Sequence, residues 1–213
     1  MQSDGMESNW AVEHLQTIRT LMERTALYRR ALAPIMIFNG AVGLTGGLVG
    51  WQLGLGSPRA FILLWTGLAA AALAGSFLLV RRQALKAAEP FWSPPTRRVA
   101  QALVAPFTVG AVVSLILASR FDNPGTEIPL VATTVWLWLY GCGLSAAGFF
   151  MPRGIKLLGA LFIAAGCLLA ALLVLNINLG VHSPHGMMAF GFGGLHLAYG
   201  VYLYFTEPRR NEP

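Results

Sequence analysis

Residues 186–205 read GMMAFGFGGLHLAYGVYLYF. A helix needs roughly 20 apolar residues to cross a bilayer, because the hydrocarbon core is about 30 Å thick and each residue rises about 1.5 Å. This stretch meets that length and contains no Asp, Glu, Lys or Arg. It therefore predicts a membrane-spanning helix, with His196 near its middle.

Five further stretches have the same character, and the chain as a whole is built for an apolar solvent. Only 11% of its 213 residues are charged and 55% are hydrophobic, whereas soluble domains carry about 25% charged residues. The composition predicts an all-α membrane protein with six transmembrane helices arranged as three hairpins. The predicted spans are 33–51, 60–80, 99–118, 128–150, 157–176 and 187–205.

The charged residues fall in the gaps between these spans and predict the orientation. Thirteen of the 15 Lys and Arg residues lie in segments on one side, and only Arg59 and Arg120 lie on the other. Cytoplasmic segments carry the Lys and Arg excess, so both termini should be cytoplasmic. The sequence thus divides into a cytoplasmic segment 1–32, a six-span bundle 33–206 and a cytoplasmic tail 207–213. No short apolar core with a cleavage site precedes the first span, so no cleaved signal peptide is expected.

The cytoplasmic N-terminal segment predicts an amphipathic helix. Asn9 is suited to cap it, and apolar residues then recur at helical spacing among four arginines. Such a helix can lie on anionic lipid or dock on a soluble protein, and the pattern leaves both partners open. The span at 33–51 is rich in glycine, and Gly43 and Gly47 share one face. Small residues at this spacing let helices approach closely in lipid.

Three blocks of the chain carry a resemblance. They are Glu13–Arg24 followed by Tyr28, Leu137–Cys142, and Gly191–Gly200. These blocks resemble segments of a group of small six-span bacterial inner-membrane proteins of uncharacterised activity. The resemblance implies the same fold and a bacterial inner membrane, and it brings no activity with it.

His196 is the one side chain in the predicted spans that changes charge near neutral pH. Ionisable groups at this depth usually face the interior of a bundle. One interpretation is a neutral structural histidine bonded to Tyr140, Ser145 or a backbone carbonyl. The other is a buried polar site for a ligand, proton or cofactor, for which His196 and Tyr140 are the candidate residues. In a straight α-helix His185 would share a face with His196.

Other chemistry finds little support in the sequence. Cys142 and Cys167 lie in different spans, and neither is spaced from a second ligand as in known metal sites. Histidines and methionines such as those at 182–188 are common in loops and at membrane interfaces. No metal or cofactor is therefore predicted. The spans hold no carboxylate, and no nucleophile elbow, phosphate loop or HExxH motif is present. No catalytic residue is therefore expected. The orientation pattern explains the positive charge without nucleic acid.

These observations predict a non-enzymatic membrane protein with an accessory or sensory role. The alternative function is a small transporter or channel for an uncharged or weakly basic solute. A continuous polar cavity that reaches His196 would favour the alternative.

Overall fold

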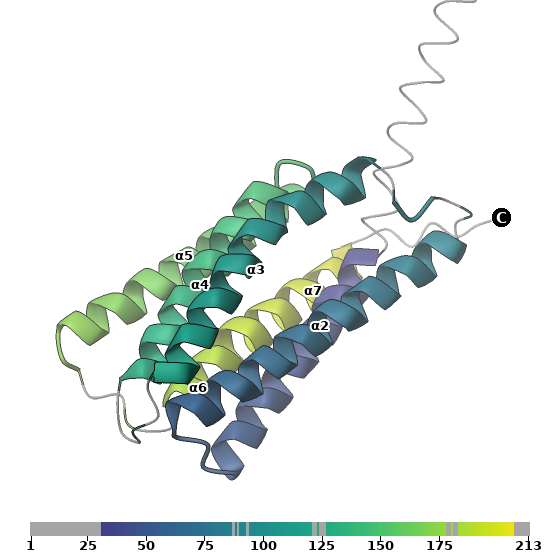
Figure 1. Cartoon of the computed structure of the whole chain (residues 1–213). Helices are drawn as coiled ribbons and strands as arrows, with labels where there is room; N and C mark the ends of the chain where they lie inside the picture. The colour runs from purple at the N-terminus through teal and green to yellow at the C-terminus, as the bar shows by residue number, and fades with distance from the viewer. Residues whose placement is uncertain are drawn as a thin grey trace, which may run out of the picture.

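The computed structural model describes residues 31–86, 88, 90–92, 94–120, 123, 127–177, 180 and 183–206. All regular structure in these ranges is helical (Figure 1). The predicted N-terminal amphipathic helix and the tail 207–213 lie outside the described residues. The all-α prediction is confirmed for the part of the chain that the structure covers.

Five of the helices are long and apolar enough to cross a membrane, counted over the described ranges. They are Ala31–Gln52, α2 (Pro58–Lys86), α3 (Pro94–Arg120), α4 (Ile128–Ala147) and α5 (Arg153–Val174). The first three contain the predicted spans 33–51, 60–80 and 99–118. The helices α4 and α5 end at Ala147 and Val174, three and two residues before the predicted ends at 150 and 176. Apolar side chains such as Leu63 and Leu168 remain exposed on the outer surface, as expected of a surface that faces lipid.

The helices α2 and α3 extend well beyond the predicted apolar stretches. The apolar run of α2 ends at Val80, but the helix continues through Arg81 to Lys86, because Arg, Gln, Ala, Leu and Lys are all good helix formers. The helix α3 begins at Pro94, where the missing amide of proline is tolerated in the first turn. The α2–α3 connection is therefore shorter than the sequence pattern predicted.

The sixth predicted span has a different form from the other five. Residues 183–206 are helical throughout, but they form three consecutive segments: α6 (Ser183–Met188), the π-helix η1 (Ala189–Leu195) and α7 (His196–Thr206). No single α-helix of spanning length is present in this region of the described chain. Three glycines, Gly191, Gly193 and Gly194, lie inside the π-helical segment.

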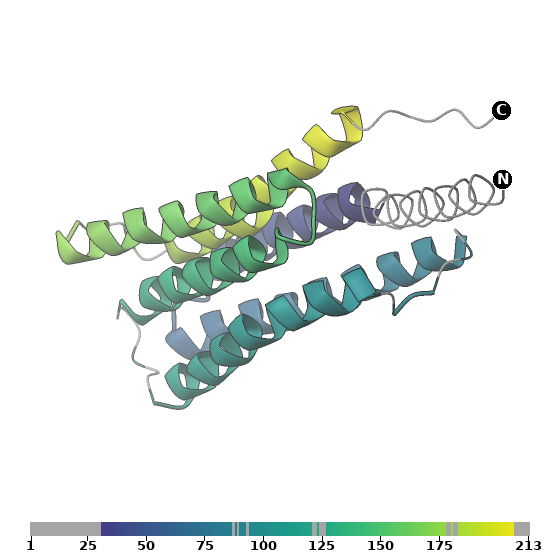
Figure 2. The same cartoon turned by 90° about the horizontal axis from the view of Figure 1, so that it is seen from above.

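The helices run up and down along one bundle axis. The start of the first helix, the turns that join α2 to α3 and α4 to α5, and the end of α7 lie at the same end of the bundle (Figures 1 and 2). Among the helices from α2 to α7, α4 and α5 pack most extensively on one another. A buried cluster around Phe162 and Leu144 joins this pair to the first helix and α7. A second cluster around Phe61 and Trp65 lies between α2, α4 and α6.

Glycine allows the first helix to approach the C-terminal helical segments closely. A Cβ at Gly43 would collide with the backbone of Phe192 and Gly193, and one at Gly47 would collide with Ala189. A Cβ at Gly40 would meet the backbone of Leu197. The predicted packing role of the Gly43–Gly47 face is therefore confirmed.

Candidate functional site

A large pocket lies between the helices of the bundle and is open on one side. Its volume is about 690 Å³, and residues from the first helix and from α2 through α7 line it. Among the described residues of its wall, none is charged. Most are aliphatic or aromatic. Five helices contribute side chains with a hydroxyl, amide or imidazole group: Asn39, Ser76, Thr96, Thr108, Tyr140 and His196. Pockets of this size with a few convergent polar groups are typical small-molecule sites.

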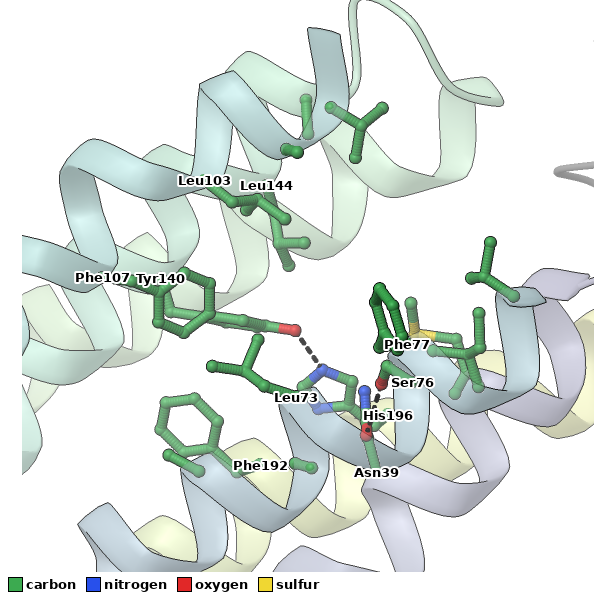
Figure 3. A pocket seen from close by; sticks show the side chains of 18 of the residues that line it. Asn39, Leu73, Ser76, Phe77, Leu103, Phe107, Tyr140, Leu144, Phe192 and His196 are labelled. Atoms are coloured by element: carbon green, nitrogen blue, oxygen red, sulfur yellow. Dashed lines mark hydrogen bonds between the residues drawn. The ribbon is translucent and has the colours of Figure 1, made fainter. Parts of the chain in front are cut away.

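The structure brings the two sequence-predicted site residues together. Tyr140 on α4 points its hydroxyl at Nε2 of His196, 2.6 Å away (Figure 3). His196 is 1% exposed. The rings of Phe162 and Phe192 lie 5.4 Å and 6.3 Å from the imidazole, measured between centroids. The imidazole therefore lies in an aromatic enclosure with one strong polar contact.

The two nitrogens of His196 differ in their surroundings. Nδ1 makes no hydrogen bond of good geometry with any described residue. The carbonyls of Gly191 and Phe192, one turn earlier, nevertheless approach the ring. A carbonyl can only accept, so the proton of the neutral imidazole is favoured on Nδ1. In this assigned tautomer Nε2 accepts a hydrogen bond from the Tyr140 hydroxyl.

A second polar pair lines the same pocket, and its pairing was missed in the sequence. The Ser76 hydroxyl on α2 donates to Oδ1 of Asn39 on the first helix, over 3.1 Å (Figure 3). Asn39 is next to Gly40, which packs on Leu197, so Asn39 lies close in the fold to His196. Polar residues inside apolar spans are a signal for such sites, but which residues pair depends on helix packing.

His185 lies outside the pocket wall, and both of its ring nitrogens make hydrogen bonds. Trp65 Nε1 donates to His185 Nδ1 over 3.2 Å, and His185 Nε2 donates to the carbonyl of Leu55 over 3.0 Å. The expectation that His185 shares a face with His196 assumed a straight α-helix, and this assumption was wrong. The π-helical segment lies between them and holds more residues per turn than an α-helix, so the two imidazoles contact different helices.

The other candidate ligands do not converge. Cys142 and Cys167 are both exposed on the helices that carry them. No group of three or more His, Cys, Asp or Glu side chains that could hold a metal occurs in the described ranges. His182 lies outside those ranges. The pocket is therefore the candidate site, and its chemistry is that of hydrogen bonds in an apolar cavity.

These features define the class of protein: an all-α, multi-pass membrane protein with a pocket inside its helix bundle. No family model, curated protein or solved structure matches the chain. The resemblance to small bacterial inner-membrane proteins therefore identifies no family.

Proposed function

We propose that the chain is a six-span bacterial inner-membrane protein that binds an uncharged, lipid-soluble ligand inside its bundle and acts without catalysis, in a sensory or accessory role. Residues 183–206 form the sixth span in this proposal, with both termini in the cytoplasm. The region comprises 24 residues, the length that a spanning helix needs.

One observation carries the proposal, namely the pocket with its uncharged wall. The pocket has a volume of about 690 Å³ and is open on one side, so it offers an apolar ligand both a space and an entrance. Leu73 and Phe77 of α2 line the pocket and are still 48% and 49% exposed. The pocket is thus accessible from the outer surface beside α2, where a ligand dissolved in lipid would enter.

The alternative is a transporter or channel for an uncharged or weakly basic solute. Such a role needs a continuous polar path through the bundle. The pocket reaches His196, but its wall is apolar apart from a few hydrogen-bonding groups. This composition favours a binding site for an apolar ligand over a path for a polar solute.

Bromine quenching of tryptophan fluorescence tests the proposal. Trp65, Trp92 and Trp136 line the pocket, and replacing the other three tryptophans by Phe leaves these three as reporters. In lipid nanodiscs, 1-bromodecane should quench them in a saturable manner. Quenching that rises linearly with the membrane concentration of 1-bromodecane would contradict a binding site.

Two substitutions on α2 provide a matched pair for this experiment. Ala72 lines the pocket, whereas Ala74 is exposed and does not. We expect Ala72→Phe to remove the saturable component by filling the pocket and Ala74→Phe to keep it. Equal saturable quenching in both variants would place the binding elsewhere.

A further inference from the structure

We infer that the ligand of this pocket is a neutral amphiphile with one hydroxyl group, which hydrogen-bonds to Tyr140 and Asn39 while its apolar tail lies between α2 and α3. The inference rests on the proposed function and names the class of ligand for the same site. It is drawn from the charge, depth and hydrogen-bonding capacity of the pocket wall.

The first step concerns charge and depth. Tyr140 lies seven residues before the end of α4, and His196 lies ten before the end of α7. At about 1.5 Å per residue these groups are about 10–15 Å inside the ends of their helices. A carboxylate, phosphate or ammonium at this depth would need an opposite charge. The described wall offers none, so the polar group of the ligand is neutral.

The second step concerns the hydrogen bonds that remain available. When the Tyr140 hydroxyl donates to His196 Nε2, its oxygen can still accept one hydrogen bond. Ser76 uses one end of the Asn39 amide, which leaves the Nδ2 hydrogens as donors. A hydroxyl group both donates and accepts, so it matches both residues. A ketone or an ether only accepts, and it would leave the Tyr140 oxygen unmatched.

The third step concerns the tail. From the polar groups the wall continues along apolar side chains of α2 and α3, including Leu73, Phe77, Leu103 and Phe107 (Figure 3). At the α2–α3 turn it ends at Phe91 and Trp92, whose rings lie 6.2 Å apart. This arrangement suits an alkyl or similar apolar chain.

Competition with 1-bromodecane in nanodiscs tests this inference. The competitors share a ten-carbon chain and differ in the head group: n-decanol, decyl methyl ether, decanoate and decyltrimethylammonium, compared at equal membrane concentration. We expect n-decanol to displace the probe at about tenfold lower concentration than either ion, since burying an unpaired charge is strongly unfavourable. Its advantage over the ether should be about fivefold, the effect of one net hydrogen bond.

Variants assign the head-group preference to Tyr140. Tyr140→Phe keeps the ring and removes the oxygen, so it should abolish the advantage of n-decanol over the ether. Tyr202→Phe is the matched control, because Tyr202 is 59% exposed and outside the pocket wall, and it should keep the advantage. Asn39→Leu removes a donor that the alcohol and the ether oxygens share, so it should weaken displacement by both about fivefold and keep the advantage of n-decanol. It gives a second reading should Tyr140→Phe fold poorly, because equal displacement by both compounds in Asn39→Leu and in the unchanged chain would contradict the contact with Asn39.

The outcomes separate the inference from the proposed function. Saturable quenching without preference for the alcohol, or preference for an ion, overturns the hydroxyl ligand and leaves the binding function standing. Absence of saturable quenching overturns both.

A hydroxyl lipid of the membrane and a free hydrophobic alcohol share this chemistry. Mass spectrometry of lipids retained by the purified chain distinguishes these sources. Enrichment of neutral hydroxyl lipids supports the inference with a membrane source, and enrichment of anionic phospholipids that is lost in Ala72→Phe contradicts it. Saturable displacement by n-decanol with no retained lipid supports a free alcohol.

Discussion

Single glycines set the distance between the first helix and the C-terminal helical segments. At Gly43 the nearest atoms to an added Cβ belong to the backbone of Phe192 and Gly193, which cannot rotate away as a flexible side chain can. At Gly67 on α2 an added Cβ meets no atom within 4 Å. Substituting alanine at both positions therefore distinguishes a steric clash, expected only at Gly43, from the higher helix propensity of alanine, which acts at both.

Gly43→Ala should destabilise the bundle by about 1–3 kcal/mol, the usual effect of overpacking a tight contact. Gly67→Ala should be neutral or stabilising by up to about 1 kcal/mol, because alanine favours the helix. Unfolding of both variants in mixed detergent micelles measures the difference. A Gly43→Ala variant as stable as Gly67→Ala would mean that the two helices are not packed as described.

The hydrogen bond between Trp65 and His185 joins α2 to α6 in the second buried cluster. Trp65→Phe retains an aromatic ring but leaves Nδ1 of the buried His185 without its donor. We expect a loss of about 1–3 kcal/mol in the free energy of unfolding, the effect of an unsatisfied buried group. The control is Trp92→Phe, since Trp92 is 58% exposed, and a similar loss there would argue against the hydrogen bond as the cause.

At the scale of elements, α2 is longer than a bilayer requires. Its 29 residues extend over about 43 Å, whereas the hydrocarbon core is about 30 Å thick. Arg81 and Arg82 lie near its C-terminal end, where long basic side chains reach the polar interface. The end of α2 should therefore project out of the hydrocarbon.

Cysteine labelling measures where α2 leaves the membrane. In a background with Cys142→Ala and Cys167→Ala, Arg82→Cys should react with a membrane-impermeant maleimide, and Leu73→Cys should be protected. Labelling of Arg82→Cys should require access to the cytoplasmic face. Reaction of both cysteines at similar rates would show that α2 lies in water along its length.

The π-helical segment η1 is a feature that hydrophobic periodicity did not predict. The glycines of η1 are compatible with an ordinary packed helix, and nothing in their spacing predicts a wider turn. The segment packs closely on its neighbours: Gly43 lies against the backbone of Phe192 and Gly193, and the side chain of Leu137 lies against Gly191. Helical ends were similarly mispredicted at α2 and α3, because hydropathy marks the lipid-facing stretch and the helix continues beyond it.

At the scale of the whole molecule, the topology depends on whether residues 183–206 cross the membrane. A reporter enzyme that is active only outside the cytoplasm, fused after Pro213, should be inactive, and a fluorescent protein that folds only in the cytoplasm should be bright. The positive-inside pattern is the reason for this expectation. The opposite result would place the C-terminus outside the cytoplasm and contradict the predicted topology.

The sequence alone determined the membrane class and the first five long apolar helices. Both follow from composition and run length. These two properties decide how each stretch partitions between water and lipid, whatever its neighbours in the fold are. It also marked His196 and Tyr140 as polar groups in apolar surroundings. Only the tertiary structure decided that they form a pair, that Asn39 and Ser76 line the same cavity, and that His185 belongs elsewhere. These relations depend on the distances and rotations between helices, which are set by contacts between residues far apart in the chain.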